Sequence, residues 1–149
     1  MRARFTGLEA SGNLRLLDGP QTVDLELRGD LVRAINRSTG QFLPRIAPAR
    51  VGATLVWGQG PWGARLGVSH AAAQKKVPVG QLTTDSYTLV NAALTYRQKL
   101  GAASLLWFAR LDNIGDTLAI PAASILTQTA PGKAPLPGRS LSLGLQASF

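Results

Sequence analysis

Residues 138–149 read Gly-Arg-Ser-Leu-Ser-Leu-Gly-Leu-Gln-Ala-Ser-Phe, and from Leu141 onward every second side chain is apolar. Strict alternation predicts a β-strand with one apolar and one polar face, because successive side chains of a strand point to opposite sides. The last apolar position is the terminal Phe149. A strand that ends on an aromatic residue of its apolar face favours a transmembrane β-barrel, in which aromatic residues gather at the membrane interfaces.

The composition allows one domain and excludes a membrane-spanning helix. The chain has 149 residues, of which 45% are hydrophobic, but no apolar run reaches the roughly 18 residues that a helix needs to cross a bilayer. Alternating strands are the other way to satisfy the backbone across a membrane. Because there is no cysteine, we expect neither a disulfide framework nor a thiolate metal site. Residues 1–5 lack the apolar segment of a secretory signal, so we expect a piece of a longer chain or a truncated product.

The formal net charge of the chain is +8, from 16 basic and 8 acidic residues. A nucleic-acid-binding surface needs such charges in a patch or stripe, with aromatic residues between them where it binds single strands. Here the basic residues are scattered, and only Lys75 and Lys76 are adjacent. We therefore expect no nucleic-acid partner.

Seven strand-like segments follow one another, separated by alternately short and long connections. They cover residues 4–16, 23–34, 49–57, 62–73, 86–97, 103–112 and 141–149. Asp18-Gly19-Pro20 is a typical short turn, whereas the links 35–48, 74–85 and 113–137 are long. Outer-membrane barrels combine short periplasmic turns with long extracellular loops, and their strands need about 9 to 11 residues to cross. The sequence thus predicts an all-β fold, an antiparallel up-and-down meander of about seven strands that is a partial transmembrane β-barrel.

Aromatic residues of the apolar face gather at the short-turn ends of the segments. Trp57 and Trp62 flank one short turn, Tyr96 precedes another, and Phe149 ends the chain. These four positions predict an aromatic girdle at the periplasmic interface. In a soluble sandwich, Trp57 and Trp62 would instead be core residues.

Charged residues occupy the opposite, polar face of the segments. We expect them to face the lumen of a barrel, where opposite charges pair across neighbouring strands. The expected lumen-facing residues are Asp24, Glu26, Arg28, Asp30, Arg50, Arg65, Arg97 and Arg110. In a soluble protein the same residues would form an ordinary solvated face. The apolar face favours the barrel, since no segment has the pattern of a covering helix.

Neither catalysis nor a resident cofactor is expected from this sequence. His70, the single histidine, lies in phase with Leu66 and Val68 and has no histidine or cysteine companion for a metal site. No glycine-rich phosphate loop is present. Asp112 and Asp116 lie where a ligand held by the following loop would reach them, but Asp-Asn-Ile-Gly-Asp is also a common turn signal, which we favour.

Five stretches, taken in order, carry a resemblance to a known family. They are residues 7–9 (Gly-Leu-Glu), 43–52 (Leu-Pro-Arg-Ile-Ala-Pro-Ala-Arg-Val-Gly), 87–92 (Tyr-Thr-Leu-Val-Asn-Ala), 112–116 (Asp-Asn-Ile-Gly-Asp) and 137–149, which begins Pro-Gly-Arg. Their order and spacing over nearly the whole chain resemble the C-terminal end of a TonB-dependent outer-membrane receptor. The resemblance implies that residues 1–149 are a C-terminal barrel segment without the plug domain.

In that family a barrel of about 22 strands surrounds an N-terminal plug. An energy-coupling protein pulls on a short box near the N-terminus to admit siderophores, metal complexes or cobalamin. The resemblance implies a bacterial outer-membrane location and a role in active uptake of a siderophore or other metal complex. The implied partners are membrane lipid, the remainder of the barrel and plug, the energy-coupling protein through the missing N-terminal part, and the barrel-assembly machinery. Leu143, Leu145 and Phe149 resemble the terminal signal that this machinery reads.

The sequence departs from the family pattern because it has no plug, coupling box or signal peptide, and only about a third of the barrel. Seven strands do not close as an even-stranded barrel, and the first and last would expose hydrogen-bonding edges. We therefore expect a fragment that is inactive in transport by itself. Two alternatives stay open: a small non-transporting outer-membrane barrel, which predicts an eighth strand, and a soluble all-β ligand-binding module, which predicts a buried apolar face.

Overall fold

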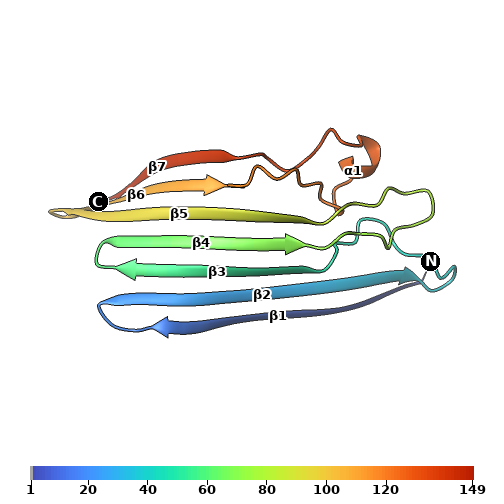
Figure 1. Ribbon diagram of the computed structural model, residues 1–149, viewed down its shortest axis with the longest axis horizontal. Coiled ribbons are helices and arrows are strands. Elements are labelled where there is room, and N and C mark those ends of the chain that lie inside the picture. The colour runs from blue at the N-terminus through green and yellow to red at the C-terminus, as the bar shows by residue number, and fades with distance from the viewer. Residues whose placement is uncertain (1) are drawn as a thin grey trace.

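The computed structural model describes residues 2–149, which form seven β-strands and one short helix. The strands are β1 (Ala3–Leu17), β2 (Gln21–Asn36), β3 (Arg50–Gln59), β4 (Trp62–Ala71), β5 (Tyr87–Leu100), β6 (Ala103–Asp112) and β7 (Ser140–Ser148), and the helix is α1 (Leu126–Thr129). All strands belong to one sheet, in which each pairs antiparallel with its neighbours in sequence (Figure 1). The predicted all-β meander is confirmed.

The short and long connections lie at opposite ends of this sheet. The turns after β1, β3 and β5 lie at the same end as the C-terminus, whereas the long loops and α1 lie at the other end (Figure 1). Gly60 and Gly101 occupy two of the tight turns with φ angles of +53° and +58°. Glycine adopts this left-handed conformation without steric cost, which is why the turns are tight.

Every strand except β6 differs by one to three residues at one or both ends from the range expected from the sequence. The predicted fourth strand reaches residue 73, whereas β4 ends at Ala71, and Gln74 pairs with Thr84 inside the following loop. The predicted last strand includes Phe149, whereas β7 ends at Ser148, the last residue with a partner in register. The link 113–137 contains α1, a single helical turn that no alternating pattern signals. Within residues 2–149, no helix has the length and hydropathy needed to span a membrane.

The register brings the apolar positions of all seven strands onto one face. One row of directly opposed residues crosses the sheet and consists of Leu14, Leu25, Leu55, Leu66, Ala92, Leu111 and Leu141. The adjacent row points to the other face and consists of Arg15, Asp24, Val56, Arg65, Ala93, Arg110 and Ser142. A slip of one residue would move a leucine of any strand to the polar face, so the alternation specifies the register.

The sheet is a single layer, and no other part of residues 2–149 covers its apolar face. Among residues 2–149, only Ala34, Ala71 and Ala119 are buried hydrophobic residues, and no large side chain of this part is fully buried. Leu8 and Leu143 keep 67% and 72% of their surface exposed. Full burial of one leucine side chain would contribute about 1.5–3 kcal/mol, so in water this fold leaves most of its hydrophobic stabilisation unrealised. The buried apolar face that a soluble module requires is absent from this part of the chain.

The sheet also does not close on itself. β1 pairs with β2 alone and β7 with β6 alone, and every residue of β1 is exposed. Unpaired N–H and C=O groups therefore line both edges. The eighth strand that a small closed barrel requires is not found among residues 2–149.

Candidate functional site

The polar face of the sheet carries charged residues whose positions follow from the register. On this face lie Asp24, Glu26, Arg28 and Asp30 of β2, Arg50 of β3, Arg65 of β4, Arg97 of β5 and Arg110 of β6. The structure thus brings all eight expected residues to one side of the sheet. That this side borders a lumen stays a prediction at this point.

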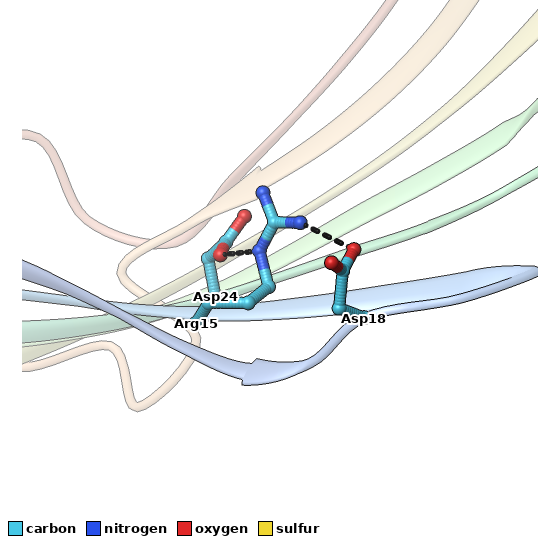
Figure 2. Close-up of polar contacts among 3 residues, drawn as sticks. All are labelled: Arg15, Asp18 and Asp24. Atoms are coloured by element: carbon cyan, nitrogen blue, oxygen red, sulfur yellow. Dashed lines mark hydrogen bonds and ion pairs between the residues drawn. The ribbon is translucent and has the colours of Figure 1, made fainter.

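Several of these charges pair with a residue directly opposite on the neighbouring strand. Arg50 donates to the carboxylate of Asp30 from Nε at 3.1 Å and from Nη2 at 2.9 Å. Figure 2 shows the same arrangement at the short-turn end, where the guanidinium of Arg15 lies between Asp24, its opposite residue, and Asp18 of the turn. Both arginines keep at least half of their side-chain surface exposed, so these pairs act mainly to fix side-chain positions.

The pair formed by Arg65 and Glu26 reaches across an intervening strand. Nη2 of Arg65 on β4 donates to Oε2 of Glu26 on β2 over 2.5 Å. Small residues leave room for this contact, because Thr54 lies opposite Glu26 on β3 and Gly67 lies opposite Thr54 on β4. The two side chains keep 52% and 42% of their surface exposed, so both charges remain accessible to a ligand.

Arg28 lies against β3 instead of forming an ion pair. A Cβ atom at Gly52, its opposite residue, would stand 2.9 Å from Nε of Arg28, so any side chain there would displace the guanidinium. Among residues 2–149, neither Arg28 nor Arg97 takes part in an ion pair, whereas Arg110 pairs with Asp112 at 2.7 Å. Arg28 is therefore a charge that this part of the chain leaves uncompensated.

Three of the arginines surround one depression, which we call the polar-face hollow. It has a volume of about 370 Å³, and its polar lining comprises Arg28, Thr54, Arg65, Ser69, Asn91, Arg110 and Asp112. Guanidinium, amide and hydroxyl groups are hydrogen-bond donors, and guanidinium groups bind carboxylate or phosphate oxygens in a forked geometry. Arg65 and Arg110 already donate to Glu26 and Asp112. Within residues 2–149, Arg28 is therefore the arginine of the hollow whose charge is available to a negatively charged oxygen atom of a ligand.

The aromatic residues of the apolar face lie near the short turns. Trp62 and Tyr96 are directly opposite, with ring centroids 4.6 Å apart, and Trp57 donates from Nε1 to Gln21 at 3.3 Å. Trp107, which the expected girdle leaves out, lies opposite Tyr96 and donates to Gln98 at 3.2 Å. The alternating positions of the apolar face include Trp107, and this pattern would have added it to the expected girdle.

The C-terminal residues expected to form the assembly signal lie on the edge strand and just beyond it. Leu143 and Leu145 are opposite Ala109 and Trp107 on the apolar face and are exposed. Phe149 follows the last paired residue and is fully exposed. Both the girdle and the assembly signal stay predictions.

Phe108 is an aromatic residue of the polar face that the sequence analysis missed. It lies opposite Gly144 of β7, and a Cβ atom at that glycine would overlap the phenyl ring. The glycine therefore makes room for the ring across the strand pair. Residues 105–109 are all apolar, so Phe108 was not distinguished from its neighbours, although it shares a face with the polar residues at 104, 110 and 112.

Two glutamine side chains connect the three long loops. Gln74, only 7% exposed, pairs through its backbone with Thr84, and its Nε2 donates to the carbonyl of Ile46 at 2.8 Å. Gln128 accepts from the N–H of Leu82 at 2.9 Å and donates to its carbonyl at 3.0 Å. These contacts join loops 37–49, 72–86 and 113–139 into one assembly, which we call the loop layer.

Asn113 joins the loop-side ends of β5, β6 and β7. Its N–H donates to the side chain of Asn91 at 2.8 Å, and its Nδ2 donates to the carbonyls of Thr117 and Pro137 at 2.9 and 3.1 Å. The nearby Asp116 accepts the backbone N–H of Arg139 at 2.9 Å. This geometry favours a turn role for the stretch 112–116 over a ligand contact.

His70 lies on the apolar face in phase with Leu66 and Val68, as expected. It stands opposite Val51 and Thr88, and its Nδ1 is 2.9 Å from Oγ1 of Thr88. In the described part of the chain, no three histidine, cysteine or acidic side chains come together as a metal site.

Comparisons with known proteins show a family and a similar fold. A family model described as "TonB dependent receptor-like, beta-barrel" matches residues 2–114. The fold is similar to that of a solved structure, "Copper transporter OprC", with a TM-score of 0.78 and 20% identity over 99% of this chain. The match covers 24% of the transporter, so this chain spans about a quarter of its length. The search of curated proteins found no match.

Proposed function

The chain belongs to the TonB-dependent receptor family, within its β-barrel domain, and we propose that it is part of the barrel wall of an outer-membrane receptor for active uptake of a metal complex. The observation that carries this proposal is one open sheet with an uncovered apolar face and a charged opposite face. In a membrane barrel, the apolar face contacts hydrocarbon and the polar face lines the lumen. A membrane barrel therefore gives both faces of the sheet a suitable environment. In water, only the charged face would have one.

The proposed substrate class is a siderophore or another metal complex that bears negatively charged oxygen atoms. The donors of the polar-face hollow, above all Arg28, Arg65 and Arg110, support this class because they match carboxylate and similar oxygens. The name of the similar structure, a copper transporter, is consistent with a metal-containing substrate. A complex of iron and a complex of copper are therefore the two probes of choice.

The proposed partners follow from the unsatisfied parts of the sheet. The free edges of β1 and β7 would pair with the remaining strands of a barrel, and a plug would occupy the space beside the charged face. The energy-coupling protein would act on this plug. The assembly machinery would recognise Leu143, Leu145 and Phe149, and Trp57, Trp62, Tyr96 and Phe149 would mark the periplasmic interface of the bacterial outer membrane.

Uptake by cells tests the proposal directly. We would introduce Arg28→Gln/Arg65→Gln/Arg110→Gln into the gene of a complete receptor that contains this barrel segment, and measure uptake by cells of ⁵⁵Fe bound to a panel of siderophores and of ⁶⁴Cu(II) complexes. We expect the KM of the transported complex to rise by about tenfold or more, because each lost charge-assisted hydrogen bond is worth about 1.5–3 kcal/mol when desolvated. A gene deletion defines the background.

The matched control is Arg37→Gln/Lys133→Gln/Arg139→Gln, which removes the same charge from exposed residues outside the strands. This control should leave uptake of the complex unchanged. Identical uptake by the deletion strain and the parent for every probe would contradict the proposed function. An equal rise in KM in both triple variants would contradict the role of the polar-face hollow.

A further inference from the structure

The apolar face contains a depression on the side of the sheet opposite the charges, which we call the apolar groove. It is about 510 Å³ in volume and lies over β1, β2, β3 and β4. On the apolar face its lining comprises Ala10, Gly12, Leu27, Gly29, Val51, Ala53, Val68 and His70. The size lies within the range of about 300–1,000 Å³ that is usual for small-molecule sites.

A second depression lies at the loop-side end of the same strands, and we call it the basic hollow. It is about 420 Å³ in volume, and Arg33, Lys75, Lys76 and Phe42 contribute to its lining. The guanidinium carbon of Arg33 lies 5.4 Å from the centroid of the Phe42 ring, a cation–π contact that holds the charge beside this ring. No carboxylate lines either depression, and none of the three cations forms an ion pair within residues 2–149.

The register makes the two depressions consecutive on one face. Leu31 and Arg33 follow Gly29 at alternate positions of β2, and their opposite residues on β1 are Leu8 and Thr6. Gly29 lines the apolar groove, whereas Leu31 and Arg33 of the same face line the basic hollow, together with Val32 and Ala34 from the opposite face. A ligand that extends along β2 therefore meets first an apolar and then a cationic surface.

We infer that the apolar groove and the basic hollow together form a binding site for one lipid with a negatively charged phosphate headgroup. An acyl chain lies in the groove against Gly12, Gly29 and Ala53, and the phosphate contacts Arg33, Lys75 and Lys76. Basic pockets at the level of lipid headgroups bind anionic lipids through such contacts. The site rests on the proposed membrane location, and it lies on the face of the sheet that a transported substrate does not contact.

A single-cysteine label tests this site, since the chain has no cysteine of its own. Leu55 lies on the apolar face of β3, one row beyond the groove residue Ala53, and Leu143 lies on the same face of β7, away from the groove. We would attach a fluorophore at Leu55→Cys or Leu143→Cys, reconstitute the full chain in phosphatidylcholine vesicles, and add brominated phosphatidylglycerol or brominated phosphatidylcholine. The readout is the mole fraction of brominated lipid at half-maximal quenching.

At Leu55→Cys we expect half-maximal quenching at about a tenfold lower fraction of brominated phosphatidylglycerol than of brominated phosphatidylcholine. At Leu143→Cys the two lipids should quench alike. Arg33→Gln/Lys75→Gln/Lys76→Gln should abolish the preference at Leu55→Cys, whereas Lys99→Gln/Lys133→Gln/Arg139→Gln, the matched loss of exposed charge, should preserve it. Gly12→Leu, whose new side chain has open space around its Cβ atom, should fill the groove and weaken quenching at Leu55→Cys.

Two different negative results distinguish a failure of the lipid site from a failure of the proposed function on which it rests. Equal quenching by the two lipids at Leu55→Cys, or a preference that survives the Arg33/Lys75/Lys76 variant, would overturn the lipid site and leave the membrane location intact. Absence of quenching at both labelled positions would place the apolar face away from hydrocarbon. That result would overturn the lipid site together with the proposed function.

Discussion

Asn113 is the residue on which the loop-side end of the sheet depends most. It is 3% exposed and has a φ angle of +47°. Asparagine tolerates this left-handed conformation better than most residues, and its amide both donates and accepts hydrogen bonds. One side chain thereby satisfies the carbonyls of Thr117 and Pro137 and the N–H of Thr117.

We expect Asn113→Ala to lower the free energy of unfolding by about 2–4 kcal/mol, because buried groups lose their partners and alanine is strained at this φ. Urea titration of the chain in phospholipid vesicles, followed by tryptophan fluorescence, measures this change. Asn113→Gly also removes the amide, but glycine adopts this φ angle without strain. The free energy of unfolding should therefore fall less in Asn113→Gly than in Asn113→Ala. A stability of Asn113→Ala equal to that of the parent would show that Asn113 does not hold the strand ends together.

At the scale of elements, the strands and the loops are held by different means. The strands form a continuous ladder between sequence neighbours, whereas the loop layer depends on the side chains of Gln74 and Gln128. A carboxamide offers one donor and one acceptor in the arrangement of a peptide group, so it can pair with a backbone as a strand does. Gln128 therefore couples loop 113–139 to loop 72–86 through its two hydrogen bonds with Leu82.

Gln128→Ala should release this coupling without disturbing the sheet. We expect amide hydrogen exchange at Leu82 to accelerate by about tenfold, since two hydrogen bonds of about 0.5–1.5 kcal/mol each are lost. Exchange in β3 and β4 should stay unchanged. Gln81→Ala is the matched control because no hydrogen bond involves its side chain. Unchanged exchange at Leu82 in Gln128→Ala would argue against a coupled loop layer.

At the scale of the whole molecule, one sheet separates two chemical environments. The leucine row from Leu14 to Leu141 and the charged row from Arg15 to Ser142 are one residue apart in each strand. Adjacent residues of a single strand should therefore respond very differently to the same substitution. This difference depends on what the apolar face contacts, and so it reports the placement of the whole sheet.

Leu55→Lys and Thr54→Lys compare the two faces within β3. In phospholipid vesicles we expect Leu55→Lys to cost about 2–4 kcal/mol of stability, the penalty of a cation near the middle of a bilayer. Thr54→Lys, next to Glu26 on the polar face, should cost less than about 1 kcal/mol. Urea-induced unfolding monitored by tryptophan fluorescence measures both variants. Equal costs for the two variants would refute hydrocarbon contact with the apolar face.

Much of this architecture could be predicted because alternation is a local property. Leu141 and Leu143 show which face is apolar without reference to any other strand, and the alternation then restricts the register. The prediction failed for contacts that no local pattern indicates. The contact between Phe108 and Gly144 joins two strands, and a loop residue such as Gln128 shows no sign of the partner, 46 residues away, that it binds.

The polar-face hollow likewise has features that the sequence predicts and features that it does not predict. Its arginines were placed on one face by alternation, but the space available to Arg28 depends on Gly52 of another strand. The pairing of Arg65 with Glu26 across β3 likewise requires the small residues between them. Distances across two strands depend on every intervening side chain, which no single segment encodes.

The amino-acid sequence by itself determined the strand faces and the order of short turns and long loops, since both follow from neighbouring residues. Only the tertiary structure decided which charges meet, how the loops join, and that a cationic hollow continues the apolar groove. Those features arise when residues distant in the chain come within hydrogen-bonding or van der Waals distance, and the register of seven strands acting together sets that proximity.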